Sequence, residues 1–139
     1  MKHVEYVNTF GMGEGELNEL LRTRRVGVLA LADAGDAYAV PVAYDYDGES
    51  LLVRLDSRDE SAKIEHLETT GTATFVLYDA ETPSWSVIVR GPLREREGFD
   101  ETRVDERFPD IRVFGEEIDE MEAVVYELEM DEVTGRRAE

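Results

Sequence analysis

The sequence predicts a mainly β protein, a β-barrel with flanking helices, folded as a single domain over residues 1–139. Short apolar runs recur along the chain, and tight turns join the first of them, which indicates an antiparallel sheet. Several runs are apolar at every position, as is typical of strands buried on both faces. No helical segment separates the early strands, so a parallel α/β sheet is disfavoured. A small closed barrel with helices across its openings satisfies these observations.

The first half of the chain predicts one helix followed by three strands. Glu14–Thr23 is expected to be helical because its leucines share one face and its first turn is acidic. Val26–Ala32, which is apolar throughout, is expected to be a strand buried on both faces. A turn leads to a strand over Tyr38–Tyr46, and an Asp-Gly pair, a strong hairpin signal, joins it to a strand over Leu51–Leu55.

The second half predicts helices between strands. Asp59–Thr69 is expected to be a helix with Ile64 and Leu67 facing inward. Thr72–Tyr78 follows as a strand, and Trp85–Leu93 as a long strand that carries a Gly-Pro break. The chain is completed by helices over Phe99–Phe108 and Glu116–Glu122 and a closing strand over Ala123–Asp131, which gives about six strands in all.

Composition excludes several functions. The chain has 33 acidic residues against 15 basic ones, a formal net charge of −18 and no cysteine. Disulfide scaffolds, thiolate-zinc sites and catalytic cysteines are therefore excluded. The negative charge argues against nucleic acid and anionic membranes as partners. No stretch is long and apolar enough to span a membrane and the N-terminus lacks a signal sequence, so a cytoplasmic protein is expected.

The kind of basic residue is also unusual, since Lys2 and Lys63 are the only lysines. Abundant acid with very little lysine resembles the proteins of halophiles that accumulate salt, where screening removes the self-repulsion. An acidic interaction surface is the alternative interpretation.

The segment from Arg54 to Lys63 carries the clearest candidate site. It leaves a strand, passes through Asp56 and Ser57 and enters the second expected helix with Ser61 in its first turns. A helix N-terminus offers free N–H groups, and the serine hydroxyls, Lys63 and either Arg54 or Arg58 add donors and charge. The segment predicts an anion site; an ordinary helix cap with a surface ion pair is the alternative.

Three further features carry weaker signals. Pro41 lies inside an apolar strand, where it indicates an edge whose unpaired backbone faces either solvent or a ligand. Trp85, the one tryptophan, opens a long strand next to Ser86 and is by itself typical of a core or interface anchor. His3 and His66 form no metal-binding or catalytic spacing, and the acidic residues form no EF-hand loop, so no metal site is expected.

The ordered series VGVLALA, YAVPVAYDYDGE, LLVRL, SAKIEHL, ATFVLY and WSVIVRGPL resembles the pyridoxamine 5′-phosphate oxidase-like, FMN-binding split-barrel family. The resemblance is clearest from Leu17 to Leu93. It implies a six-stranded antiparallel FMN-binding split barrel of the Greek-key type, in a homodimer with two FMN molecules, each at the subunit interface. It also implies a small-molecule substrate.

The resemblance further implies which residues contact the cofactor. The backbone of Val40, Pro41 and Val42 would run along the flavin ring. The ribityl and phosphate region would lie against Arg54, Leu55, Asp56 and Ser57, with Ser61 and Lys63 on the phosphate. Trp85 and Ser86 would approach from the partner subunit.

The functional expectation is a flavin-dependent oxidoreductase, since flavins carry the electrons in such proteins. The Arg and His pair that pyridoxamine phosphate oxidases use for their substrate is not matched, because no histidine accompanies Arg136 and Arg137. Relatives of this fold bind F420 or haem, so an F420-dependent reductase and a non-catalytic flavin or haem carrier are alternatives. A structural acidic interaction protein is a third alternative, and the sequence identifies no acid or base.

Overall fold

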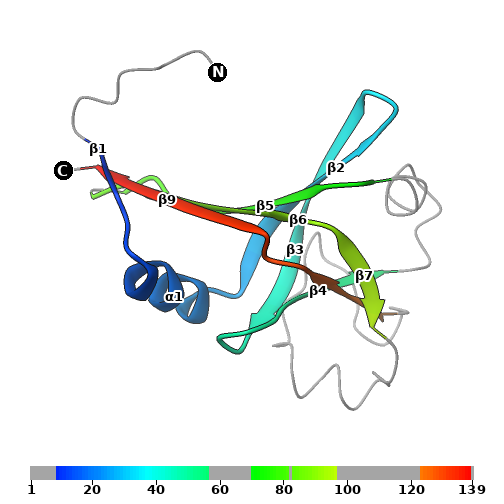
Figure 1. Ribbon diagram of the computed structural model, residues 1–139, viewed down its shortest axis with the longest axis horizontal. Helices are drawn as coiled ribbons and strands as arrows, with labels where there is room; N and C mark the ends of the chain where they lie inside the picture. The colour runs from blue at the N-terminus through cyan, green and yellow to red at the C-terminus, as the bar shows by residue number, and fades with distance from the viewer. Residues whose placement is uncertain (1–8, 57–69, 82, 97–122, 139) are drawn as a thin grey trace.

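The computed structural model describes residues 9–56, 70–81, 83–96 and 123–138, which form one helix and nine strands (Figure 1). The bounds of these elements are β1 (Thr9–Gly11), α1 (Glu14–Thr23), β2 (Val26–Asp33), β3 (Asp36–Tyr46), β4 (Leu51–Asp56), β5 (Ala73–Asp79), β6 (Trp85–Gly91), β7 (Leu93–Arg96), β8 (Ala123–Leu128) and β9 (Glu132–Ala138).

The mainly β class and the first helix are confirmed, and the expected strands are present with small shifts at their ends. Six strands were expected, whereas the described residues form nine separate strands. The run expected over Trp85–Leu93 breaks at Pro92 into β6 and β7, because proline has no N–H for the ladder. The expected closing strand ends at Leu128, and a further strand, β9, follows it. The three helices expected after residue 57 lie outside the described residues.

In the described part of the chain, six strands nevertheless form the barrel wall when each bent strand is counted once. All pairings are antiparallel, and the strand order is β1-β9-β6-β5-β2-β3-β4-β8-β7. β6 pairs with β9 and β7 pairs with β8, so two bent strands, β6–β7 and β8–β9, run side by side along their length. The order β5, β2, β3, β4, β8–β9 and β6–β7 therefore returns to β5, which closes the sheet into a ring.

The two bends touch each other where the ring closes. The N–H of Glu129 donates to the carbonyl of Pro92 at 2.9 Å, and the N–H of Asp131 donates to the carbonyl of Arg90 at 3.1 Å. A Cβ atom on Gly91 would lie 1.7 Å from the carbonyl oxygen of Glu129. Closure thus requires a residue without a side chain at position 91.

Two hairpins set the register of the early strands. β2 and β3 flank a two-residue turn at Ala34 and Gly35, which have φ of 48° and 89°, and Figure 1 shows this hairpin projecting from the barrel. The predicted hairpin at Asp47 is confirmed. Its loop runs over four residues, and the Asp47 carboxylate accepts from the N–H groups of Glu49 and Ser50 at 2.9 and 2.8 Å.

The core fills the interior of the ring, and α1 covers one opening (Figure 1). Leu21 of α1 is buried, and the Tyr44 hydroxyl donates to its carbonyl at 2.7 Å. Burial raises the pKa of Tyr44 well above its usual value. The core residues, all buried, are Leu21, Leu29, Leu31, Val42, Tyr44, Leu51, Val53, Leu55, Ala73, Phe75, Leu77, Val87, Val89 and Leu128.

The expectation that the strand at Val26–Ala32 is buried on both faces is wrong. Gly27, Leu29 and Leu31 point into the barrel and are buried, whereas Val26 on the other face is 38% exposed. β4 does have two buried faces, since all residues from Leu51 to Leu55 are buried. None of the described helices is long and apolar enough to cross a membrane.

Candidate functional site

The site residues predicted in the first half of the chain lie on both sides of the point where β3 and β4 stop pairing and diverge. These strands pair from Tyr46 and Leu51 as far as Ala43 and Arg54, and the pairing ends there. Beyond that point Val40–Val42 continues along β2, while Leu55 and Asp56 continue along β8. The structure therefore places the predicted flavin-ring segment and part of the predicted ribityl segment at the two edges of one gap in the pairing.

The β3 edge presents backbone groups to this gap. Asp33 and Asp36 flank a two-residue turn and form a hydrogen-bonded pair, so the alternation along the ladder makes Pro41 and Val28 a non-hydrogen-bonded pair. Pro41 therefore removes no hydrogen bond from the β2–β3 ladder, because the backbone nitrogen at this position points away from β2. The same alternation turns the N–H and C=O of Ala39 and the C=O of Pro41 toward the gap. No strand of the described residues pairs with this edge.

Arg54 lies at the point where β3 and β4 part. It is 7% exposed and is the one buried charged residue in the described part of the chain. In the register it lies between Ala43 of β3 and Val125 of β8. A buried guanidinium needs compensating partners and can bind a phosphate through two parallel hydrogen bonds. Its position fits the sequence prediction of an anion site, whose other members, Ser57, Ser61 and Lys63, lie outside the described residues.

The remaining predicted residues, Trp85 and Ser86, lie on β6, at a distance from this gap along the sheet. Ser86 is on β6, and β5 and β2 lie between β6 and β3, a separation of about three strand spacings or ~14 Å. Trp85 packs against the core at the barrel end, with the Arg24 guanidinium 5.1 Å from its ring centroid. Arg24 also lies 3.6 Å from the Asp79 carboxylate. One chain thus does not bring Trp85 and Ser86 to the gap between β3 and β4.

An apolar outer face, not anticipated from the sequence, connects these two regions. It is formed by the side chains of β6, β5, β2 and β3 that point away from the barrel interior, and it contains three exposed large apolar side chains, Val26, Tyr78 and Ile88, at 38, 66 and 36%. The register aligns Ile88, Val76, Val28 and Pro41 in one row across the four strands. The apolar runs in the sequence do include these outward-facing side chains. Because polar and apolar residues do not alternate along the runs, the sequence did not show which face would be exposed in the described structure.

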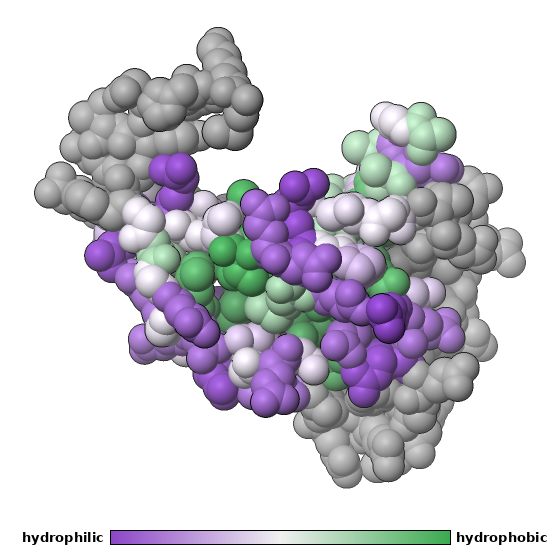
Figure 2. Space-filling view, viewed as in Figure 1, coloured by the Kyte–Doolittle hydropathy of each residue, from purple (hydrophilic) through white to green (hydrophobic). Residues whose placement is uncertain are grey.

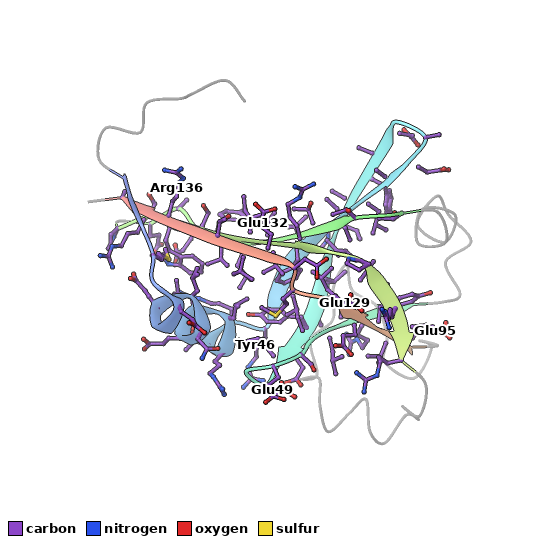
Figure 3. The ribbon with its side chains drawn as sticks, viewed as in Figure 1. Tyr46, Glu49, Glu95, Glu129, Glu132 and Arg136 are labelled. Atoms are coloured by element: carbon purple, nitrogen blue, oxygen red, sulfur yellow. The ribbon has the colours of Figure 1, made fainter. Side chains whose placement is uncertain are left out.

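The outer face ends at polar residues on β9. Figure 3 shows Glu132 and Arg136 on the side of β9 that faces away from α1. In the register they lie next to Arg90 and Ser86 of β6. Arg90 forms an ion pair of 3.6 Å with Glu132. The described residues contain no cluster of three or more side chains that could hold a metal ion.

A family comparison identifies the chain's relatives. Residues 13–137 match the family described as pyridoxamine 5′-phosphate oxidase. The chain belongs to this family. The match spans α1, the barrel strands and nearly all of β9, so it confirms the family that the order of the sequence segments suggested. A search of the curated proteins gives no match.

Several solved structures share the fold of this chain at low sequence identity. An FAD-binding protein from Mesorhizobium loti is similar with a TM-score of 0.71 at 19% identity, over 94% of this chain and 99% of that one. The FAD-binding protein from Mycobacterium smegmatis has a TM-score of 0.65 at 16% identity, covering 94% and 99%. The haem storage protein HutZ from Vibrio cholerae has a TM-score of 0.62 at 17% identity, covering 86% and 92%. These similarities establish the split-barrel fold.

Proposed function

We propose that this protein binds FMN at the interface of a homodimer and performs a redox reaction on a small molecule. The observation that carries the proposal is the parting of β3 and β4. It combines an apolar strand edge, outward-facing backbone groups and a buried arginine at one place. A flavin needs these same components, since its ring is planar and largely apolar, its pyrimidine edge forms hydrogen bonds and its phosphate is an anion.

The chain's own residues would divide these tasks. Val40 and Pro41 would lie along the ring, with the outward N–H and C=O groups of β3 available to its polar edge. Arg54 would place a positive charge near the phosphate, together with Ser57, Ser61 and Lys63, which the sequence assigns to the same anion. Bound flavin would supply electron transfer, and the protein would supply position and electrostatics.

The outer face supports the proposed homodimer. Val26, Tyr78 and Ile88 leave a contiguous apolar surface, and such surfaces mark interaction sites. A second copy that covers this face would bring its own Trp85 and Ser86 toward the gap between β3 and β4 of the first copy. That arrangement would account for the separation of the two groups of predicted cofactor residues within one chain.

Cofactor binding is tested by titrating the purified protein with FMN and following the quenching of flavin fluorescence. We expect Lys63→Ala to weaken FMN binding by roughly tenfold or more, because a charge-assisted phosphate contact is lost. Lys2→Ala, which removes the other lysine, is the matched control and should bind as the unaltered protein does. Equal affinities of the two variants would show that Lys63 does not hold the phosphate.

The identity of the cofactor is tested separately by extracting it from purified protein and recording its spectrum. FMN or its reconstitution into the colourless protein supports the proposal, and bleaching of bound flavin by NAD(P)H supports catalysis over storage. FAD, F420 or haem as the extracted group would replace FMN as the ligand. A protein that is colourless and takes up no flavin would contradict the proposed function.

A further inference from the structure

A second hollow lies between α1 and the barrel, apart from the gap between β3 and β4. It is a cavity of about 450 Å³, within the range of small-molecule sites, and opens beside the loop between β3 and β4. Figure 2 shows hydrophobic side chains there, surrounded by hydrophilic ones. Its lining residues are Glu14, Leu17, Asn18, Leu21, Tyr46, Gly48, Glu49, Met130 and Val133.

The lining divides into an apolar part and a polar part. Leu17, Met130 and Val133 pack against the barrel core, so the wall of the cavity on that side is continuous with the core. On the polar side the Tyr46 hydroxyl donates to the Asn18 side-chain oxygen at 2.5 Å, which fixes both groups. Tyr46 lies next to the labelled Glu49 in Figure 3.

The charge of this lining is negative. Glu14 and Glu49 are the charged residues of the cavity, and neither forms an ion pair with any described residue. This differs from the sheet, where Glu129 and Glu132 each pair with an arginine. Glu16, on the same helix as Glu14, also pairs with an arginine, Arg137.

The arginine that does lie nearby is directed elsewhere. Arg22 donates to the carbonyl of Asp47 at 3.3 Å, and its guanidinium lies 5.9 Å from the Tyr46 ring centroid. The Gly48 backbone is packed so closely against this guanidinium that a Cβ there would lie 2.3 Å from its nitrogen. Arg22 therefore holds the loop in place, and among the described residues the two carboxylates keep no basic partner.

We propose that this cavity binds an organic cation, with its ammonium group between Glu14 and Glu49 and a short aliphatic body against Leu17, Met130 and Val133. An ammonium ion is attracted to two carboxylates, and the aliphatic body gains free energy by leaving water against the apolar wall. An anionic ligand of the same length is excluded by the same carboxylates. The lining of this cavity includes none of the residues assigned above to the flavin.

The test is isothermal titration of the full chain with hexyltrimethylammonium, and with hexanoate as a probe of similar length and opposite charge. We expect saturable one-site binding of the cation and no binding of hexanoate. Replacing both carboxylates, Glu14→Gln with Glu49→Gln, should weaken cation binding by roughly tenfold, as expected for the loss of two partly exposed ion pairs.

A control is necessary because a protein of net charge −18 attracts cations everywhere on its surface. Glu19→Gln with Glu95→Gln removes the same charge from two exposed carboxylates outside the cavity, and it should leave the affinity unchanged. Equal weakening in both double variants, equal binding of hexanoate, or no saturable binding would each overturn the proposal. None of these results bears on FMN, which is measured in its own titration.

Discussion

The two faces of the strands β6, β5, β2 and β3 have similar amino acids and opposite surroundings. On the inner face, Leu29, Phe75 and Val89 are completely buried. On the outer face of the same strands, Val26, Tyr78 and Ile88 keep a third or more of their surface exposed. Both faces are rich in β-branched and aromatic residues, so strand propensity does not distinguish them.

The difference shows that the described residues complete one core and leave a second apolar surface exposed. The inner face is enclosed because two bent strands, β6–β7 and β8–β9, close the ring around it. The outer face has no such enclosure among the described residues. Apolar residues on both faces of a strand therefore indicate two packing surfaces. The same chain needs to cover only one of them.

The largest predicted effect is on the inner face. Phe75→Ala should lower the free energy of unfolding by roughly 3–5 kcal/mol, because it removes a fully buried ring and leaves a cavity. The Phe75 ring also packs edge-on to Tyr44 with centroids 5.0 Å apart, a contact that is lost as well. Urea denaturation followed by far-UV circular dichroism measures the change. A loss below about 1 kcal/mol would mean that the inner face is not the tightly packed core described above.

The closure of the ring predicts the next effect. Gly91→Ala introduces a Cβ at the place where the bends of β6–β7 and β8–β9 touch, only 1.7 Å from the Glu129 carbonyl oxygen. The backbone has to move, so we expect a loss of roughly 1–3 kcal/mol or more in the same denaturation experiment. Gly71→Ala is the control, since nothing lies within 4 Å of a Cβ there. Similar stabilities for both variants would contradict the tight contact between the bends.

Much of the fold could be predicted from local sequence. The leucine spacing of Glu14–Thr23 gave the bounds of α1, and turn residues located the hairpins on either side of β3. β9 was not predicted, because EVTGRRA lacks an apolar run and becomes a strand only by pairing with β6. Tertiary context overrides local propensity in such segments.

The candidate site was predictable to a smaller extent. Pro41 correctly indicated an unpaired strand edge, because the missing N–H is a local property of the residue. The parting of β3 and β4 was not predictable, since it depends on where two pairings end. The roles of Ser57, Ser61 and Lys63 stay predictions, as these residues lie outside the described part of the chain.

A smaller effect concerns the contact between α1 and the inner face. Tyr44→Phe should cost about 0.5–1.5 kcal/mol, because it removes the hydrogen bond to the Leu21 carbonyl. The effect should depend on pH. Burial raises the pKa of Tyr44 in the folded protein above the ordinary value of 10.0, so the unfolded state loses this proton first.

The stability contributed by the protonated tyrosine is therefore complete below about pH 10 and decreases as the pH rises above it. We expect the unfolding midpoint of the unaltered protein to fall more steeply above pH 10 than that of Tyr44→Phe. Parallel pH profiles for the two proteins would show that Tyr44 titrates as an exposed tyrosine does.

The smallest effect on stability is expected on the outer face, where the effect on assembly should be the largest. Ile88→Asp places a charge on a side chain that is already 36% exposed, so the fold of one chain should lose no more than about 1 kcal/mol. In the proposed homodimer the same charge would be buried without a partner, which is strongly unfavourable. Light scattering after size exclusion should thus give a dimer for the unaltered protein and a monomer for Ile88→Asp. Thr134 lies next to Ile88 in the register, at an exposed position of β9. Thr134→Asp therefore tests whether the interface extends onto β9. If Ile88→Asp remains dimeric, or if the unaltered protein is a monomer, the outer face is not the surface on which two copies meet.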